Sequence, residues 1–195
     1  MTVRIFKRGI VLALCLLIAI CPLFAQAEDF RDMFSNMEYE EEILKKYRYD
    51  EYERLYEHVV MEAWDVDDPN FATQSRAMQA LHVVLTFDME IQNGGVAQFF
   101  WNQGSACASL VPDMLREMGL DDVAVLYEQF MQENQITLAE IDTYRERFPH
   151  MGEEFYSLHP FDDFDLAYVK IWAETNLNSR FLDYAEQHPE FYGVI

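Results

Sequence analysis

Cysteine is scarce in this chain of 195 residues. Three cysteines occur, and two of them, Cys15 and Cys21, lie near the N-terminus. If that end is removed, Cys107 remains alone and no disulfide can form within the chain, which excludes a disulfide-stapled exported domain. A lone cysteine is most often a small buried apolar residue, so we expect Cys107 in the core rather than as a nucleophile or an intermolecular bridge.

Basic residues are also few. The chain has 14 Lys and Arg against 35 Asp and Glu, which gives a net charge of −21 at pH 7. Such a charge repels the phosphates of nucleic acids and the surface of anionic lipids, so we expect neither as a partner. It favours basic proteins, cations and cationic ligands. The alternative is that the charge serves only solubility.

Familiar catalytic and metal-binding motifs are missing. The sequence has no HExxH, no pair of cysteines after the N-terminus, no Gly-x-Ser-x-Gly and no phosphate-binding loop. Asp162, Asp163 and Asp165 lack the spacing and the glycine of an EF-hand, and helix capping explains them better than calcium binding. The sequence therefore assigns no catalytic residue, no cofactor and no metal ion, and it leans against an enzyme.

The N-terminus has the three parts of a secretory signal. Arg4, Lys7 and Arg8 form a basic start, residues 10–24 are apolar and uncharged, and Ala-Gln-Ala follows at 25–27. The apolar run of 15 residues is shorter than the roughly 20 that cross a bilayer as a helix. An uncleaved anchor and a lipid-modified cysteine are the alternatives.

We therefore expect a signal peptide over residues 1–27 and an acidic domain over residues 28–195. Cleavage removes three basic residues, so Lys and Arg fall from 14 to 11 while Asp and Glu stay at 35, and the net charge becomes −24. The expected location is periplasmic or secreted, with no stable membrane anchoring after cleavage.

Apolar residues recur at helical spacing along the rest of the chain. Asp68, Asp121, Thr137 (in a capping box with Glu140) and either Asp162 or Asp163 are the expected helix caps. The sequence predicts an all-α fold, an irregular single-domain bundle of about seven or eight helices. The expected helical segments are 37–64, 71–92, 96–102, 109–118, 121–133, 137–147, 153–158 and 162–187.

One motif stands out, which we name the Asn-Gly-Gly motif. It consists of Glu90, Asn93, Gly94, Gly95, Gln98, Phe99, Phe100 and Asn102. Asn-Gly is also a strong hairpin signal, but the twenty residues before it have helical periodicity. We interpret the motif as a place where a helix ends, turns and begins again. The glycines would allow positive φ or a close approach of the backbone, and Phe99 and Phe100 would anchor the turn in the core.

A second interpretation gives the same residues a binding role. The polar side chains of Asn93, Gln98 and Asn102 would line a pocket for a small ligand, and the protein would then be a small-ligand binder or an enzyme. The structural interpretation is the more common one for such residues, because buried amides usually satisfy backbone or side-chain hydrogen bonds.

The Asn-Gly-Gly motif, together with residues 115–119 and the aromatic pair at 155–156, resembles a bacterial domain family named after a DNA-mimic protein. The resemblance covers roughly residues 79–184. It implies an all-α fold and, as in the namesake, an acidic homodimer that occupies the DNA site of a transcription factor. For this chain it implies an acidic interaction module with a basic protein as partner. The signal peptide weighs against literal DNA mimicry, because a periplasmic protein does not meet transcription factors.

Overall fold

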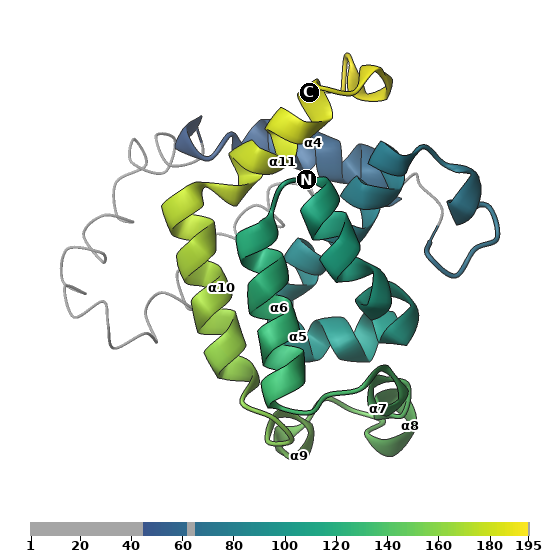
Figure 1. Cartoon of the computed structure of the whole chain (residues 1–195), viewed down its shortest axis with the longest axis vertical. Helices are drawn as coiled ribbons and strands as arrows, with labels where there is room; N and C mark the ends of the chain where they lie inside the picture. Colours follow the sequence, from purple (N-terminus) through teal and green to yellow (C-terminus); the bar gives the residue numbers. More distant parts are fainter. Residues whose placement is uncertain (1–44, 62–64, 195) are drawn as a thin grey trace, which may run out of the picture. The chain divides into compact units, whose positions relative to one another are not determined.

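The computed structural model describes residues 45–61 and 65–194 (Figure 1). The chain divides into two compact units, Met1–Asp50 and Glu51–Ile195, and the second contains most of the described residues. The predicted signal peptide lies outside the described residues. The helix expected over 37–64 is described in part, as α4 (Tyr49–Tyr56) followed by a π-helical turn, η1 (Glu57–Met61).

The longest element is α5 (Arg76–Glu117). Its N-cap is Ser75, whose hydroxyl accepts a hydrogen bond from the Met78 N–H at 3.1 Å. We expected the helix to begin near residue 71 with Asp68 as its cap, and this was wrong. Asp68 instead accepts a bond from the Asn70 N–H at 2.8 Å and so holds the turn before η2, a 3₁₀ helix (Phe71–Thr73).

Glycines interrupt α5 at two points. Gly94 (φ −159°) and Gly95 (φ 81°) form the first break, and Gly104 (φ 65°) forms the second. The expected end and restart at the Asn-Gly-Gly motif is confirmed. The third segment begins at 105 rather than at 109, because the Asp142 carboxylate accepts the Ser105 N–H at 3.1 Å and caps a helix there.

The helix expected over 121–133 is observed with those bounds, whereas the later elements are shorter than the sequence suggested. The segment expected over 137–147 is divided by a turn, and the one expected over 162–187 is divided at Asn176, which has φ 52° and ψ 66°. The observed elements are α6 (Asp121–Glu133), α7 (Leu138–Ile141), α8 (Tyr144–Arg147), α9 (Glu153–Tyr156), α10 (Phe161–Thr175), α11 (Leu177–Glu186) and η3 (Pro189–Phe191).

One of the expected caps on these helices is confirmed. The Thr137 hydroxyl accepts the Glu140 N–H at 3.1 Å at the start of α7. The N-cap of α6 is Leu120 rather than Asp121, and the N-cap of α10 is Pro160 rather than Asp162 or Asp163. These carboxylates lie within the first turn of each helix, where the free N–H groups favour negative charge.

The helices pack around an aromatic core. Segments of α5 contact α6, α7 and α10, and α10 contacts α6 and α11. In Figure 1 the short helices α7, α8 and α9 lie at the end where α6 finishes and α10 begins. Phe87 and Phe99 meet edge to face with ring centroids 5.0 Å apart, and Phe87 also meets Tyr127 and Tyr168. Such edge-to-face pairs stabilise a core beyond the area that they bury.

The all-α prediction is confirmed for the part of the chain that the structure describes, which contains helices and no β-strand. Cys107 is buried as expected, and burial raises the pKa of its thiol. His82 is likewise packed at the edge of the core, against Phe71. No helix within residues 45–61 or 65–194 is both long and apolar enough to cross a membrane.

Candidate functional site

Glu90 is the centre of the Asn-Gly-Gly motif. Its Oε2 accepts hydrogen bonds from the amide nitrogens of Gln98 (2.7 Å) and Asn102 (2.8 Å). Its Oε1 accepts a third bond from the amide of Gln103 at 2.8 Å. Bonds to an ionised acceptor are stronger than bonds between neutral groups. The Glu90 carboxylate therefore connects the end of the first α5 segment (76–93) to side chains along the second segment (96–103).

The two glycines of the motif have different roles. Gly94 has extended φ, which any residue adopts, but a Cβ there would overlap the side-chain amide of Gln98. Gly95 has φ 81° and ψ 175°, a conformation that essentially only glycine adopts. A Cβ on Gly95 would overlap the carboxylate of Asp165. Position 94 thus requires glycine because Gln98 approaches it closely. Position 95 requires glycine both for its positive φ and for the close approach of Asp165.

Asp165 caps a helix other than its own. It belongs to α10, and its Oδ1 accepts the N–H of Val96, the first residue of the second α5 segment, at 2.8 Å. Burial raises the pKa of Asp165 to about 7; the bond from Val96 acts in the opposite direction, and the charge of Asp162 adds to the increase. The sequence grouped Asp165 with local caps, and the structure corrects that interpretation.

The other members of the motif separate into core and surface. Phe99 and Phe100 are completely buried, with ring centroids 5.7 Å apart. Asn93 is exposed, and its side chain makes no hydrogen bond with any residue that the structure describes. The structure therefore brings Gln98 and Asn102 together on Glu90 and leaves Asn93 apart from them.

Asp88 is a buried carboxylate to which the sequence assigned no role. Asp88, which is fully buried, accepts hydrogen bonds from the hydroxyls of Tyr52 (2.6 Å) and Tyr168 (2.5 Å) and from the Gln92 amide (2.6 Å). Burial raises the pKa of Asp88, while the bonds from Tyr168, Tyr52 and Gln92 act to lower it. The one sequence signal was an aspartate within an apolar helical stripe.

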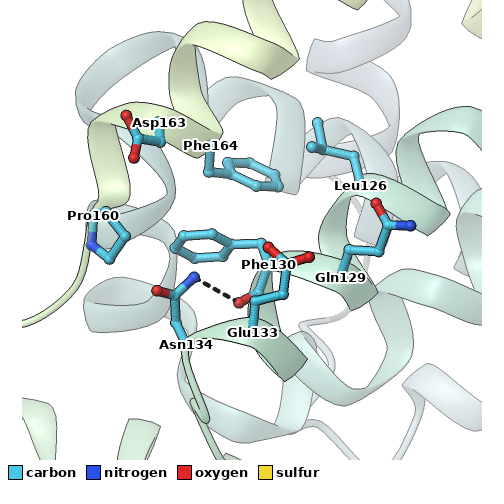
Figure 2. Close-up of a pocket in the computed structure, with 8 residues that line it drawn as sticks. All are labelled: Leu126, Gln129, Phe130, Glu133, Asn134, Pro160, Asp163 and Phe164. Carbon is cyan, nitrogen blue, oxygen red and sulfur yellow. Dashed lines mark hydrogen bonds between the residues drawn. The ribbon is translucent and has the colours of Figure 1, made fainter.

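Neither of two cavities on the described part of the chain is lined by a residue of the Asn-Gly-Gly motif. The larger, about 490 Å³, lies beside the third α5 segment, α6 and the start of α7. The smaller, about 240 Å³, lies between α6 and α10 (Figure 2). Within residues 45–61 and 65–194, no group of three or more His, Cys, Asp or Glu side chains is placed to hold a metal ion.

Negative charge dominates the surface. Residues 72–188 contain 19 acidic and six basic side chains, a net charge of −13. The ion pairs found among the described residues are Arg76–Glu117, Arg116–Glu128, Arg180–Asp122 and His159–Glu140. These pairs involve four of the 19 acidic side chains in residues 72–188.

Carboxylates gather where α7, α8 and α9 lie. We call this surface the acidic end, and it comprises the exposed residues Glu133, Glu146, Glu153, Glu154, Asp162 and Asp163. The two arginines nearby are engaged elsewhere: Arg145 donates to the Trp101 carbonyl at 2.7 Å, and Arg147 lies over the Phe148 ring. Neither forms an ion pair with the acidic end within the part of the chain that the structure describes.

Comparison with protein-family models matches residues 72–188, more than half of the chain, to the family described as DMP19-like protein. The matched residues include α5, α6, α10 and α11 in full, and they coincide closely with the range of the resemblance seen in the sequence. No curated protein and no solved structure matched the chain.

Proposed function

Because this chain belongs to the DMP19-like protein family, we propose that it is an exported, acidic protein-interaction module that binds a basic partner. The family is one of DNA mimics, which supports both an interaction role and a partner with a basic surface. The single observation that carries the proposal is the acidic end, where six exposed carboxylates gather.

Export is the second part of the proposal. The basic start, the 15-residue apolar run and the Ala-Gln-Ala site support cleavage after Ala27. The basic partner would then lie in the periplasm or outside the cell, so the anionic surface would serve a partner other than a transcription factor. The intact mass of the protein from its native host tests this. A membrane-bound species that still contains residues 1–27 would contradict it.

We further propose that the Asn-Gly-Gly motif holds the break in α5 rather than a ligand. The amide nitrogens of Gln98 and Asn102 are already bonded to Glu90. A ligand in their place would have to replace charge-assisted bonds within the protein. The alternative, a polar pocket that also involves Asn93, would require the exposed Asn93 side chain to turn toward the other two.

The interaction is tested with two variants of equal charge change. One neutralises three carboxylates of the acidic end (Glu153→Gln, Glu154→Gln, Asp162→Asn). The other neutralises three exposed carboxylates toward the opposite ends of α5, α6 and α10 (Asp113→Asn, Asp121→Asn, Glu174→Gln). A partner captured by the purified protein at low salt is identified, purified and titrated against each.

We expect the first variant to bind the basic partner roughly tenfold more weakly and the second to bind it nearly as well as the unchanged protein. Binding should also weaken from low to physiological salt, because exposed charges are screened. A captured partner without a basic surface, or binding that is insensitive to salt, would contradict the proposal.

A further inference from the structure

The smaller cavity has walls from two helices. The C-terminal half of α6 supplies Leu126, Gln129, Phe130, Glu133 and the cap residue Asn134, and the start of α10 supplies Pro160, Asp163 and Phe164. Figure 2 shows the rings of Phe130 and Phe164 one above the other in the middle of the site, with Pro160 and Asp163 on one side and Leu126 and Gln129 on the other. The volume of about 240 Å³ is that of a site for a single side chain rather than for a large ligand.

The walls of this cavity are aromatic. The centroids of the Phe130 and Phe164 rings are 5.1 Å apart, and the ring planes are inclined at 50°. Both residues are anchored in the core, with exposed fractions of 7% and 1%. Their positions are therefore fixed before any ligand binds. The face of an aromatic ring carries partial negative charge and attracts a cation placed over it.

The charged side chains that line this cavity are both acidic. Its eight lining residues include two carboxylates, Glu133 from α6 and Asp163 from α10, and no lysine or arginine. Glu133 is the last residue of α6, and the free carbonyls at a helix C-terminus add negative potential. The N-terminus of α10 has the opposite polarity, but Asp162 and Asp163 lie in its first turn and offset it.

Amide groups complete the wall. The Asn134 side-chain nitrogen donates to the Phe130 carbonyl at 2.9 Å, as the dashed line in Figure 2 shows, which leaves the amide oxygen to accept bonds from a ligand. Gln129 offers a second amide oxygen. Two carboxylates, two side-chain amides and two aromatic rings line one small space, and together they match a cationic group that donates several hydrogen bonds and has a flat face.

We propose that this cavity receives an arginine side chain of the basic partner. The inference rests on the proposed function, since it names the group by which that partner would be held at the acidic end. The guanidinium group is planar, stacks on aromatic rings and donates in a fork to carboxylates, whereas the lysine ammonium is a compact, strongly hydrated point charge. The aromatic walls and the two carboxylates therefore favour arginine over lysine.

The probe for this inference is the capped tripeptide acetyl-Gly-Arg-Gly-amide, titrated into the purified protein and followed by amide chemical shifts in NMR spectra. We expect the shifts to concentrate in residues 126–134 and 160–164. The citrulline analogue has nearly the same shape without the charge, and we expect it to bind at least about tenfold more weakly. The lysine analogue should lie between the two.

Variants identify the groups that hold the peptide. Glu133→Gln and Asp163→Asn should each weaken binding of the arginine peptide about fivefold. Glu154→Gln, which removes an equal charge from the same end but does not line the cavity, should change it less than twofold. All three side chains are exposed, so the substitutions should leave the fold intact, which the dispersion of the NMR spectra verifies.

Three results would overturn the inference: equal binding of the citrulline peptide, shifts centred elsewhere, or a loss with Glu154→Gln as large as with Glu133→Gln. Each would leave the proposed function standing if the neutralised acidic end still loses the basic partner. If instead the arginine peptide binds in the cavity but no basic partner is captured, the proposed function fails and the cavity remains a site for arginine.

Discussion

Single residues decide how α5 changes direction. Gly95 has a backbone conformation that side chains other than glycine's strongly disfavour, and its missing Cβ leaves room for the Asp165 carboxylate. Gly104 has a similar conformation, with φ 65° and ψ −169°, but the nearest atom to its absent Cβ is 3.8 Å away. A comparison of substitutions at Gly95 and Gly104 therefore distinguishes the effect of backbone strain from that of steric overlap.

We expect Gly95→Ala to lower the free energy of unfolding more than Gly104→Ala does. Backbone strain alone should cost about 1–3 kcal/mol at either site. At Gly95 the methyl group must also displace Asp165 and its bond to the Val96 N–H. Urea denaturation followed by circular dichroism measures both variants against the unchanged protein. Equal losses would show that the contact with Asp165 adds nothing.

Asp165 also gives the fold a dependence on pH. Its pKa in the folded protein, about 7, lies above the ordinary value of 3.8. Between these two values the folded state holds the proton more tightly than the unfolded state does, so this carboxyl favours folding most at low pH. That contribution is lost as the pH rises from about 4 to about 7.

Asp165→Asn keeps an oxygen to accept the Val96 N–H and removes the buried charge. We expect this variant to be more stable than the unchanged protein at pH 8 by at least about 1 kcal/mol, and to differ little from it at pH 4. Glu174→Gln, an exposed residue of the same helix, is the control for the change in net charge. Parallel stability curves for the two variants between pH 4 and pH 8 would show that burial of Asp165 is not the cause.

At the scale of the elements, carboxylates join helices that are distant in the chain. Asp88 in α5 connects α4 and α10 through the hydroxyls of Tyr52 and Tyr168. Asp165 connects α10 to the second segment of α5, and Asp142, at the end of α7, connects to the third. In a chain with an excess of acidic residues, carboxylates thus serve as the acceptors that helix starts and buried hydroxyls need.

At the scale of the whole molecule, charge repulsion opposes folding. Residues 72–188 have a net charge of −13, and the ion pairs found among the described residues involve four of their acidic side chains. Screening of this repulsion should stabilise the folded state. We expect the melting temperature to rise by several degrees when sodium chloride is increased from about 20 mM to about 300 mM. A melting temperature that falls would mean that attractive pairs outweigh the repulsion.

Features that depend on neighbouring residues followed from the sequence alone. The helical class, the break at Gly94 and Gly95, and the Thr137 cap on the Glu140 N–H were all predicted correctly. The physical reason is that helices, caps and glycine turns are formed by groups within about four positions of each other. The match over residues 72–188 confirms the family that the sequence resembles, although it does not test the Asn-Gly-Gly motif itself.

The tertiary structure decided the rest. The two tyrosine partners of Asp88 are 36 and 80 positions away from it, and Val96 is 69 positions from Asp165. No local pattern in the sequence contains such pairs, because they exist only after α4, α5 and α10 have packed together. The same holds for the cavity between α6 and α10, which is lined by both Glu133 and Asp163 because α6 ends and α10 begins there. Local sequence set which helices form, and long-range packing set which acidic groups are buried, which cap another helix and which remain at the surface.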